Sequence, residues 1–241
     1  MIDLIKIYNK YLLKKDAESQ IKRNKDNPDM MDASSGGLCM RKHYFKVNGY
    51  EKKPTDVDSL RIMRLGTIVG NEFENVMNDA FAGDLSIEYY QEILLKSERL
   101  KVAGHLDFMI VKDKKGYIYD WKTAKAYKFR NVKKGKADAL NYEIQVATYG
   151  LMALEQGLCD SIEYLALVYY NKDTSEMFEH KIPLSSIRQA EAYWLEVAER
   201  TEDFKREPIE CINKVPIYRW ECGKYCSWSH ICEASTNIRK G

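Results

Sequence analysis

Two aspartates and a lysine near the middle of the chain have the types and spacing that metal-assisted hydrolysis needs. The Asp-Lys-Lys-Gly run between Asp107 and Asp120 predicts a tight turn that joins two strands. If Val111 pairs with Gly116 across this turn, Asp107 lies opposite Asp120. Because side chains alternate along a strand, Lys122 then shares a face with both carboxylates.

Such a group of side chains predicts hydrolysis of a phosphodiester. Paired carboxylates repel each other unless a cation lies between them, and their hard oxygens suit magnesium or manganese. A bound metal lowers the pKa of its water, and a nearby amine can orient or deprotonate that water. The alternative is a sheet face that carries ordinary solvated charges, and the partner aspartate in register argues against it.

Three segments occur in the order and at the spacings of a known set of nuclease motifs. They are Gly104-His105-Leu106-Asp107, Tyr119-Asp120-Trp121-Lys122-Thr123 and Gln145-Val146-Ala147-Thr148-Tyr149. They resemble the GxxD, (D/E)xK and QxxxY motifs of the RecB-like nucleases in the PD-(D/E)xK superfamily. The resemblance implies an α/β fold of the restriction-endonuclease type, with a mixed central β-sheet flanked by helices.

The same resemblance implies a metal-dependent DNA exonuclease that acts on single-stranded DNA or DNA ends. Asp107 and Asp120 would bind Mg²⁺ or Mn²⁺, with the backbone carbonyl of Trp121 as a further ligand. Lys122 would act on the attacking water.

Gln145 and Tyr149 are four residues apart, so they lie on one face of the helix expected at 139–156. The resemblance places this pair near the DNA and the catalytic lysine. Taken alone, the two residues would be better explained as a polar residue and a half-buried tyrosine on an ordinary amphipathic helix.

One position departs from the motif pattern. Many members of the family carry a metal-binding histidine in the pattern G-T-x-x-H-x-x-x-E, where this chain has Gly70. Glu74, one turn further along the same helix, or His105 could supply the missing ligand. The departure leaves the number of metals open. It also supports an alternative function, a weak or inactive DNA-binding partner of a helicase or a CRISPR adaptation complex.

The cysteines suggest a second metal site. Three of the six crowd together in a C-x3-C-x5-C pattern at Cys222, Cys226 and Cys232, and Cys39 is the natural fourth ligand. In a chain without a secretory signal, clustered cysteines favour metal ligation over disulfides. Four thiolates suit zinc or an iron–sulfur cluster, and the ligand types alone do not separate the two.

The segment Ala33-Ser34-Ser35-Gly36-Gly37-Leu38-Cys39-Met40-Arg41-Lys42 resembles the opening of iron–sulfur RecB-family nucleases, which include the CRISPR-associated RecB-like exonucleases. The resemblance implies a structural 4Fe–4S cluster on Cys39, Cys222, Cys226 and Cys232. The usual tail spacing is C-x2-C-x5-C, and this chain has one extra residue in the first gap. The cluster would join the N- and C-terminal segments. Cys159 and Cys211 are expected to be simple thiols.

Two basic stretches are candidates for contacts with DNA. A loop is expected at 125–136, where Lys125, Lys128 and Arg130 could bind phosphates and work with Tyr149, although a solvated lysine loop is equally compatible. The second stretch runs from Arg41 to Phe45. Neither reads a base sequence, so cleavage should tolerate any sequence.

The elements that would position these groups follow from the hydrophobic pattern. Helices are expected at 1–25, 39–50, 59–81, 139–156 and 185–206, and strands at 86–95, 100–111, 117–123, 162–170 and 177–182. They suggest an N-terminal helical region (1–83), a nuclease core (84–206) and a cysteine tail (207–241) in one compact unit.

The composition agrees with a folded chain that has a solvated surface. Hydrophobic residues make up 45% and charged residues 31%, and the net charge of +2 excludes an overwhelmingly basic coat. The N-terminal stretch is expected to be an amphipathic helix, with Ile2, Ile5, Leu12 and Leu13 on or near one face, rather than a signal peptide. No run of 18 apolar residues predicts a membrane span, so a cytoplasmic location is expected.

Overall fold

The computed structural model describes residues 2–26, 29–136, 140–209, 212 and 220–232. Its elements in chain order are α1 (Leu4–Asp26), β1 (Met31–Asp32), η1 (Ala33–Ser35), α2 (Met40–Val47), α3 (Val57–Phe81), β2 (Glu88–Ser97), β3 (Val102–Lys112), β4 (Lys115–Ala124), α4 (Ala126–Lys133), α5 (Leu140–Glu155), β5 (Ser161–Asn171), β6 (Met177–Lys181), α6 (Ser186–Arg206) and η3 (Glu221–Tyr225). The five helices and the five strands expected from the sequence are all present, with bounds that differ from the expected ones by a few residues.

The strands form one mixed sheet, which confirms the expected α/β architecture. The sheet runs in the order β1-β3-β4-β5-β6, and β2 pairs with β3 outside this path. The β1–β3 and β4–β5 pairs are parallel, and the other pairs are antiparallel. Because β2 follows β3 along one whole edge, β1 and β4 share the other edge of β3 and meet it at opposite ends.

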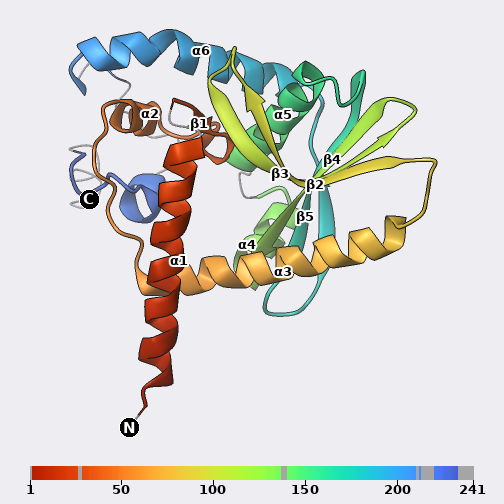
Figure 1. Cartoon of the computed structure of the whole chain (residues 1–241), viewed down its shortest axis with the longest axis horizontal. Coiled ribbons are helices and arrows are strands. Elements are labelled where there is room, and N and C mark those ends of the chain that lie inside the picture. The colour runs from red at the N-terminus through yellow and green to blue at the C-terminus, as the bar shows by residue number, and fades with distance from the viewer. Residues whose placement is uncertain (1, 27–28, 137–139, 210–211, 213–219, 233–241) are drawn as a thin grey trace.

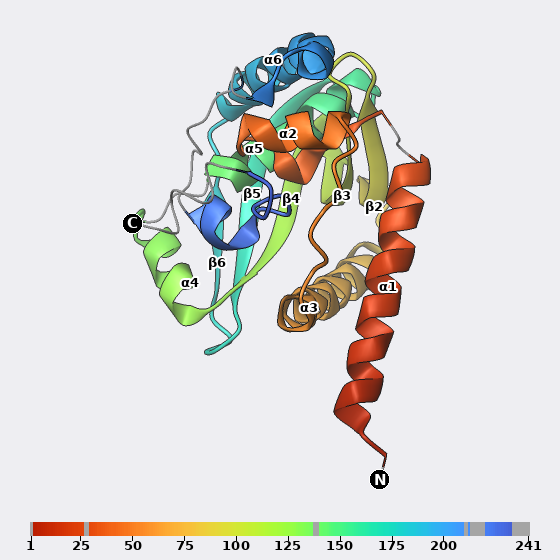
Figure 2. The same ribbon diagram turned by 90° about the vertical axis from the view of Figure 1, so that its left-hand side faces the viewer.

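Helices cover both faces of the sheet (Figure 1 and Figure 2). On one face α5 lies between the strands and α6, and its residues from Ile144 to Ala153 are buried. The Trp194 indole of α6 donates a hydrogen bond of 2.8 Å to the Thr148 hydroxyl of α5, and neither side chain is exposed to solvent. This double cover explains why the apolar residues of α5 have no single-sided pattern.

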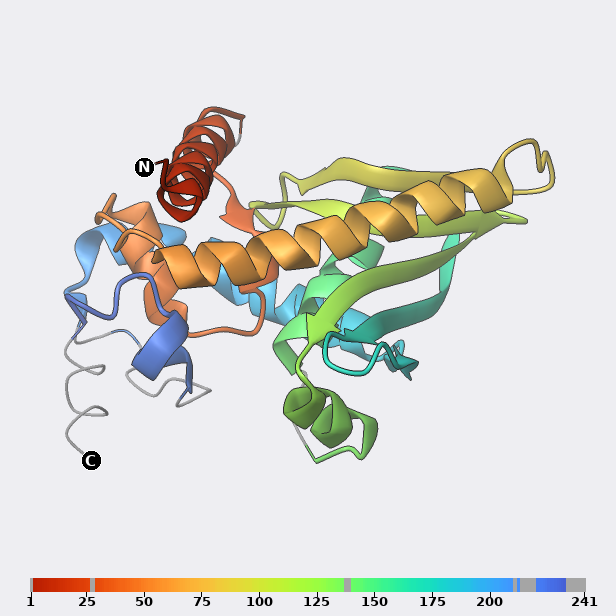
Figure 3. The same ribbon diagram turned by 90° about the horizontal axis from the view of Figure 1, so that it is seen from below.

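On the other face α3 crosses the sheet as a long rod (Figure 3). Its contacts are aromatic: the Phe73 ring stacks on Trp121 with centroids 4.6 Å apart, and the Phe81 ring stacks on Phe108 at 5.9 Å. Only Leu60 of this helix is buried. The helix is therefore held at a few aromatic points and leaves much of its apolar surface exposed.

The hairpin between β3 and β4 has the expected register, with Val111 opposite Gly116. Asp113 and Lys114 form its two-residue turn with φ angles of 50° and 61°. Two left-handed residues in succession are the signature of a type I′ turn, whose twist matches that of the strands it joins. The turn chemistry therefore sets the register that brings Asp107 and Asp120 level with each other.

The N- and C-terminal segments meet in a second, smaller core. Tyr44 and Phe45 of α2 pack there with Phe204 of α6 and Trp228 of the tail. Burial of this aromatic group corrects the expectation that Arg41 to Phe45 form a DNA-binding patch, because Arg41 and His43 are buried as well. The lysine at position 42 is the exception within the stretch, and it is described further below.

Two further expectations about the N-terminal and basic segments are wrong. In α1, Leu12 is buried, whereas Ile2, Ile5 and Leu13 are exposed, so the helix does not bury the expected apolar face. The stretch at 125–136 is mostly the helix α4 rather than a loop, because Phe129 and Val132 are buried and anchor it. No described helix has the length and apolar character that a membrane span requires.

Candidate active site

The candidate site lies where β3 and β4 separate. Their ladder ends at the Phe108–Tyr119 pair, and the next residues on the two strands are Asp107 and Asp120. Beyond this fork the backbone N–H of Trp121 donates to Asp107 Oδ2 at 2.8 Å instead of to a neighbouring strand. The fork thus turns two aligned strand positions into a pair of carboxylates that face each other.

Asp120 and Lys122 form an ion pair at the base of the fork. Asp120 is fully buried, and the side chain of Lys122 is 19% exposed. Apart from this ion pair, Asp120 Oδ2 has no hydrogen-bond donor among the described residues. The carboxylate therefore keeps lone pairs directed into the site.

Burial and mutual repulsion disfavour the state in which Asp107 and Asp120 are both ionised. Burial, and then the charge of Asp120, raise the pKa of Asp107 to about 8. Burial also raises the pKa of Asp120. Burial alone would favour the neutral amine of Lys122, but the charges of the two aspartates outweigh it and raise the pKa of this lysine. A divalent cation would relieve the same repulsion.

Gln145 and Tyr149 of α5 complete the site from the helix side. Gln145 Nε2 donates to Tyr149 Oη at 2.9 Å and to Asp120 Oδ1 at 3.3 Å. Both side chains are buried. The expected pair on one helical face therefore meets the acidic residues, and Gln145 fixes the position of the Asp120 carboxylate.

The glycine of the GxxD motif has a packing role. A Cβ atom at Gly104 would lie 2.7 Å from the Cβ of Ala33 and 3.0 Å from Cε1 of Tyr149. Only a residue without a side chain lets η1 and α5 approach β3 this closely. The motif spacing thus preserves both a ligand and the space beside it.

Glu92 is a residue of the site that the motifs did not reveal. It lies opposite Asp107 in the β2–β3 ladder, between the Gln91–Phe108 and Ile93–Leu106 pairs, and has a φ of 47°. Burial and the charges of Glu74 and Asp120 raise its pKa. A left-handed conformation inside a strand is unusual for a residue other than glycine.

Glu92 connects Glu74 to the paired aspartates. Glu74 lies close enough to Glu92 for its charge to raise the pKa of Glu92. Glu92 in turn acts on the pKa of Asp107. His105, a candidate for the missing ligand, is exposed and lies opposite Leu94. The acidic residue opposite Asp107 is Glu92.

Gly70, which stands where many members of the family have a histidine, borders empty space. Gly70 has no atom within 4 Å of where its Cβ would lie, whereas Gly66, one turn earlier, faces the Thr123 hydroxyl at 3.4 Å. The helix therefore passes the C-terminal end of β4 with room at position 70. Glu74, which acts on the pKa of Glu92, lies one turn further on.

The basic helix α4 begins just beyond the site. Lys125, Lys128 and Arg130 are exposed on it, as the sequence suggested. Lys128 Nζ donates to Tyr142 Oη at 3.2 Å and lies 4.5 Å from the centre of that ring. The centre of the Tyr142 ring also lies 5.1 Å from Lys122 Nζ, so Tyr142 links Lys122 to the basic helix. Its position three residues before Gln145 was the available signal in the sequence.

The four cysteines predicted to bind a cluster are brought into one region. Cys39, Cys222, Cys226 and Cys232 are all buried. The thiols of Cys222 and Cys226 lie close enough to Cys39 to act on its pKa, which burial raises to about 12. Arg41 Nη1 donates to the sulfur of Cys232 at 3.8 Å. Cys159 is a buried thiol at a distant position, and Cys211 lies outside the described residues.

Both sets of donors fit the groups that the sequence implies. The oxygens of Asp107 and Asp120 suit a hard divalent cation, and four buried thiols suit zinc or an iron–sulfur cluster. As they lie, the described residues contain no group of three His, Cys, Asp or Glu side chains arranged to hold a metal ion.

Comparison with known proteins identifies the family. A family model described as PD-(D/E)XK nuclease superfamily matches residues 39–233. The crystal structure of SSO0001 is 20% identical over 94% of this chain and 96% of that chain, with a TM-score of 0.58. The structure named Putative exonuclease, from Eubacterium rectale, is 13% identical over 84% and 96%, with a TM-score of 0.50.

A third solved structure, the alkaline exonuclease LHK-Exo from Laribacter hongkongensis, is 14% identical over 77% of this chain and 96% of that chain, with a TM-score of 0.42. No curated protein matches the chain. At identities of 20% or less, the first two structures show a shared fold alone. The family model, in contrast, spans most of the sequence, including the three nuclease motifs and the four cysteines of the predicted cluster. The chain therefore belongs to the PD-(D/E)XK nuclease superfamily.

Proposed function

We propose that the protein is a metal-dependent deoxyribonuclease of the RecB-like type, which degrades single-stranded DNA or DNA from its ends. The observation that carries this proposal is the convergence of Asp107, Asp120 and Lys122 in the fork between β3 and β4. The fold shared with the Eubacterium rectale protein, named as an exonuclease, agrees with cleavage from ends.

Asp107 and Asp120 would hold Mg²⁺ or Mn²⁺, with the backbone carbonyl of Trp121 as the further ligand. When bound, the cation would lower the pKa of an attacking water and neutralise charge on the phosphate. Lys122 is held by Asp120 as an ammonium, so it can orient that water or donate a hydrogen bond to the phosphate.

Gln145 and Tyr149 would restrain the reacting groups from the side of α5. The amide of Gln145 holds one oxygen of Asp120 and also the Tyr149 hydroxyl. Burial, and then the charges of both aspartates, raise the pKa of Tyr149, so this hydroxyl stays protonated and can donate to a phosphate oxygen. Lys125, Lys128 and Arg130 would guide the strand beyond the site.

A cleavage assay tests the proposal. Wild-type protein with Mn²⁺ or Mg²⁺ should degrade end-labelled single strands, and EDTA should stop the reaction. Lys122→Ala should lower the rate by at least about 100-fold while the protein keeps its fold, as circular dichroism would show. Lys115→Ala, at the exposed hairpin end of the same strand, is the matched control and should keep full activity. A fully active Lys122→Ala would disprove the assigned role.

A DNA-binding partner with a decayed site is the second candidate, and the open position at Gly70 favours it. In that case the chain would serve a helicase or a CRISPR adaptation complex. It would retain labelled DNA without cleaving it in Mg²⁺, Mn²⁺ or Ca²⁺. The same assay, combined with a binding measurement, separates the two functions.

We also propose that Cys39, Cys222, Cys226 and Cys232 hold a structural 4Fe–4S cluster. All four thiols are buried, and neighbouring cysteines act on the pKa values of Cys39 and Cys226. Both observations support a single metal group that the four thiols share. Protein purified without oxygen should be brown and contain iron and acid-labile sulfide. Cys226→Ser should lose both, whereas Cys159→Ser, a buried thiol elsewhere, should lose neither. If the purified protein instead contains stoichiometric zinc and no iron, the four cysteines form a zinc site and not an iron–sulfur cluster.

A further inference from the structure

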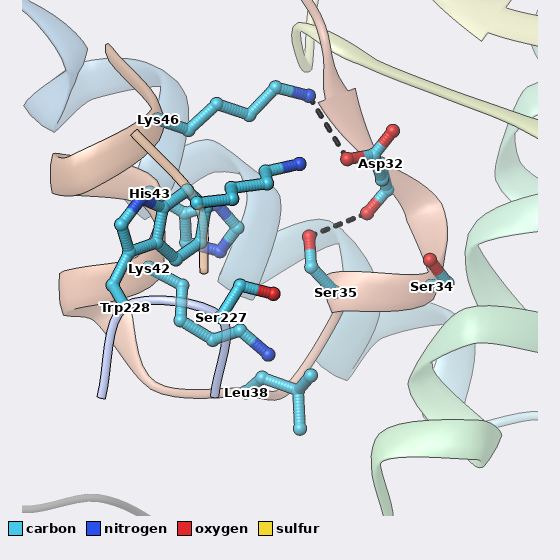
Figure 4. Close-up of a pocket in the computed structure, with 10 residues that line it drawn as sticks. Asp32, Ser34, Ser35, Leu38, Lys42, His43, Lys46, Ser227 and Trp228 are labelled. Atoms are coloured by element: carbon cyan, nitrogen blue, oxygen red, sulfur yellow. Dashed lines mark hydrogen bonds and ion pairs between the residues drawn. The ribbon is translucent and has the colours of Figure 1, made fainter. Parts of the chain in front are cut away.

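A pocket of about 160 Å³ lies between α2, η1 and the C-terminal tail. Three lysines line it, namely Lys42, Lys46 and Lys52. Figure 4 shows Lys42 and Lys46 extending from α2 toward the segment that carries Ser34 and Ser35. Its volume is far above the ~10–15 Å³ that one water requires, so it can admit a hydrated polar group.

The pocket combines cations with hydroxyl donors. Ser34, Ser35 and Ser227 line it together with the lysines, and Asp32 is the lining carboxylate. Asp32 accepts from Lys46 at 3.1 Å, and Glu221 behind the wall pairs with Lys42 at 3.1 Å, so the three lysines exceed these carboxylates by one formal charge. Ammonium and hydroxyl groups together favour an anion with several acceptor oxygens.

Lys42 is held in place from behind. Its ammonium lies 3.1 Å from the buried carboxylate of Glu221, which also accepts from the backbone N–H of Cys39 at 3.3 Å. Lys52 lies over the face of Trp228, 5.4 Å from the ring centre. These contacts come from both ends of the chain, so the pocket exists only when the terminal segments are joined.

The walls exclude recognition of a base. The Trp228 ring is 4% exposed and stacks on Phe45 with centroids 5.8 Å apart, so no base can stack on it. His43 is buried and lies 2.6 Å from the hydroxyl of Tyr193, which occupies its Nε2. A ligand here would be recognised by its negative charge alone.

We propose that this pocket binds a backbone phosphate of the DNA strand, at a distance from the bond that is cut. The inference rests on the proposed function, because it supplies that site with a grip on its substrate. It names a phosphodiester as the ligand, and it predicts no preference among bases.

The pocket and the candidate active site share one short element. Ala33 of η1 packs beside Gly104 and Tyr149, and Ser34 and Ser35 follow directly on the pocket side. Consecutive Cα atoms are 3.8 Å apart, so the serines lie within roughly 8 Å of Ala33. One strand can therefore contact both places at once.

The experiment measures binding of fluorescent oligo(dT) in Ca²⁺ by anisotropy over a range of salt concentrations. Lys52→Gln should weaken binding about three- to tenfold and lower the slope of log K against log salt by about 0.7, the share of one single-strand phosphate contact. Ser227→Asp, which adds a carboxylate and removes no lysine, should weaken binding similarly. Lys112→Gln, at the hairpin end of β3, is the control with the same charge change.

A second measurement separates this pocket from the reacting groups. Lys52→Gln should raise KM for oligonucleotides. It should leave kcat for bis(p-nitrophenyl) phosphate unchanged, because a diester of this size bound at the active site does not extend to the pocket. The proposal is overturned if Lys52→Gln and Ser227→Asp bind DNA like Lys112→Gln. A wild-type protein that binds DNA without cleaving it would refute the nuclease function while leaving this binding test intact.

Discussion

At the scale of single residues, the acidic site is defined by what replaces ladder hydrogen bonds at the fork. Trp121 donates its backbone N–H to Asp107, and Gln145 holds Asp120. Glu92 then adds a third acid through a left-handed backbone conformation. Strain of this kind is commonly retained where a side chain must be aimed, and we therefore expect Glu92 to contribute to the function of the site.

The charge of Glu92 should strengthen metal binding. Glu92→Gln keeps the side-chain shape and removes the charge that acts on Asp107, so the Mn²⁺ dissociation constant should rise about tenfold. Isothermal titration calorimetry measures this change. Glu88→Gln, at the exposed start of the same strand, is the matched control, and equal affinities for the two variants would contradict the assignment.

His43 should make stability depend on pH. Burial, and then the charges of Lys42 and Lys46, lower the pKa of His43 to about 3. The unfolded chain binds a proton near pH 6.5 and the folded chain does not, so this group's contribution is present above pH 6.5 and is lost as the pH falls toward 3.

His43→Gln removes that linkage. The advantage of the wild type over this variant in unfolding free energy should therefore be about 2 kcal/mol smaller at pH 5 than at pH 7. Urea unfolding at the two pH values measures the difference. A constant gap would mean that the imidazole has the same pKa in the folded and unfolded chains.

At the scale of elements, close packing of η1, β3 and α5 positions the motif residues. Gly104 permits this contact, whereas Gly70 borders open space on α3. The two glycines thus serve opposite purposes, although both occur in recognised motif positions.

Substitution of each glycine by alanine should separate these roles. Gly104→Ala forces backbone or Tyr149 to move and should cost about 1–3 kcal/mol, with a loss of activity. Gly70→Ala, in a helix interior with free space, should gain about 0.5–1 kcal/mol. Denaturant unfolding of both variants measures the contrast, and a stabilising Gly104→Ala would contradict the packing described here.

At the scale of the whole molecule, the termini close over the second core and the cysteines. Trp228 donates its indole N–H to the carbonyl of Tyr50 at 3.0 Å and stacks on Phe45. The Lys53 N–H donates to the carbonyl of Ser227 at 2.8 Å. These contacts attach the tail to α2 and to the segment after it.

Removal of this anchor should loosen the tail. Trp228→Ala should lower the unfolding free energy by about 3–5 kcal/mol and expose the tail to proteolysis. Trp220→Ala, whose side chain is 47% exposed, should change stability by no more than about 0.5 kcal/mol. Equal effects of the two substitutions would show that the second core does not hold the tail.

The sequence by itself determined five of the helices and five of the strands, the register of the β3–β4 hairpin and the motif residues that meet at the fork. These features depend on local information: turn chemistry, alternation along strands and spacing on one helix. Only the tertiary structure decided the roles of Glu92, Tyr142 and Lys52, because each depends on packing between segments far apart in the chain. The same reason explains why Arg41 to Phe45 were mistaken for a surface patch, since burial against Phe204 and Trp228 leaves no local signal.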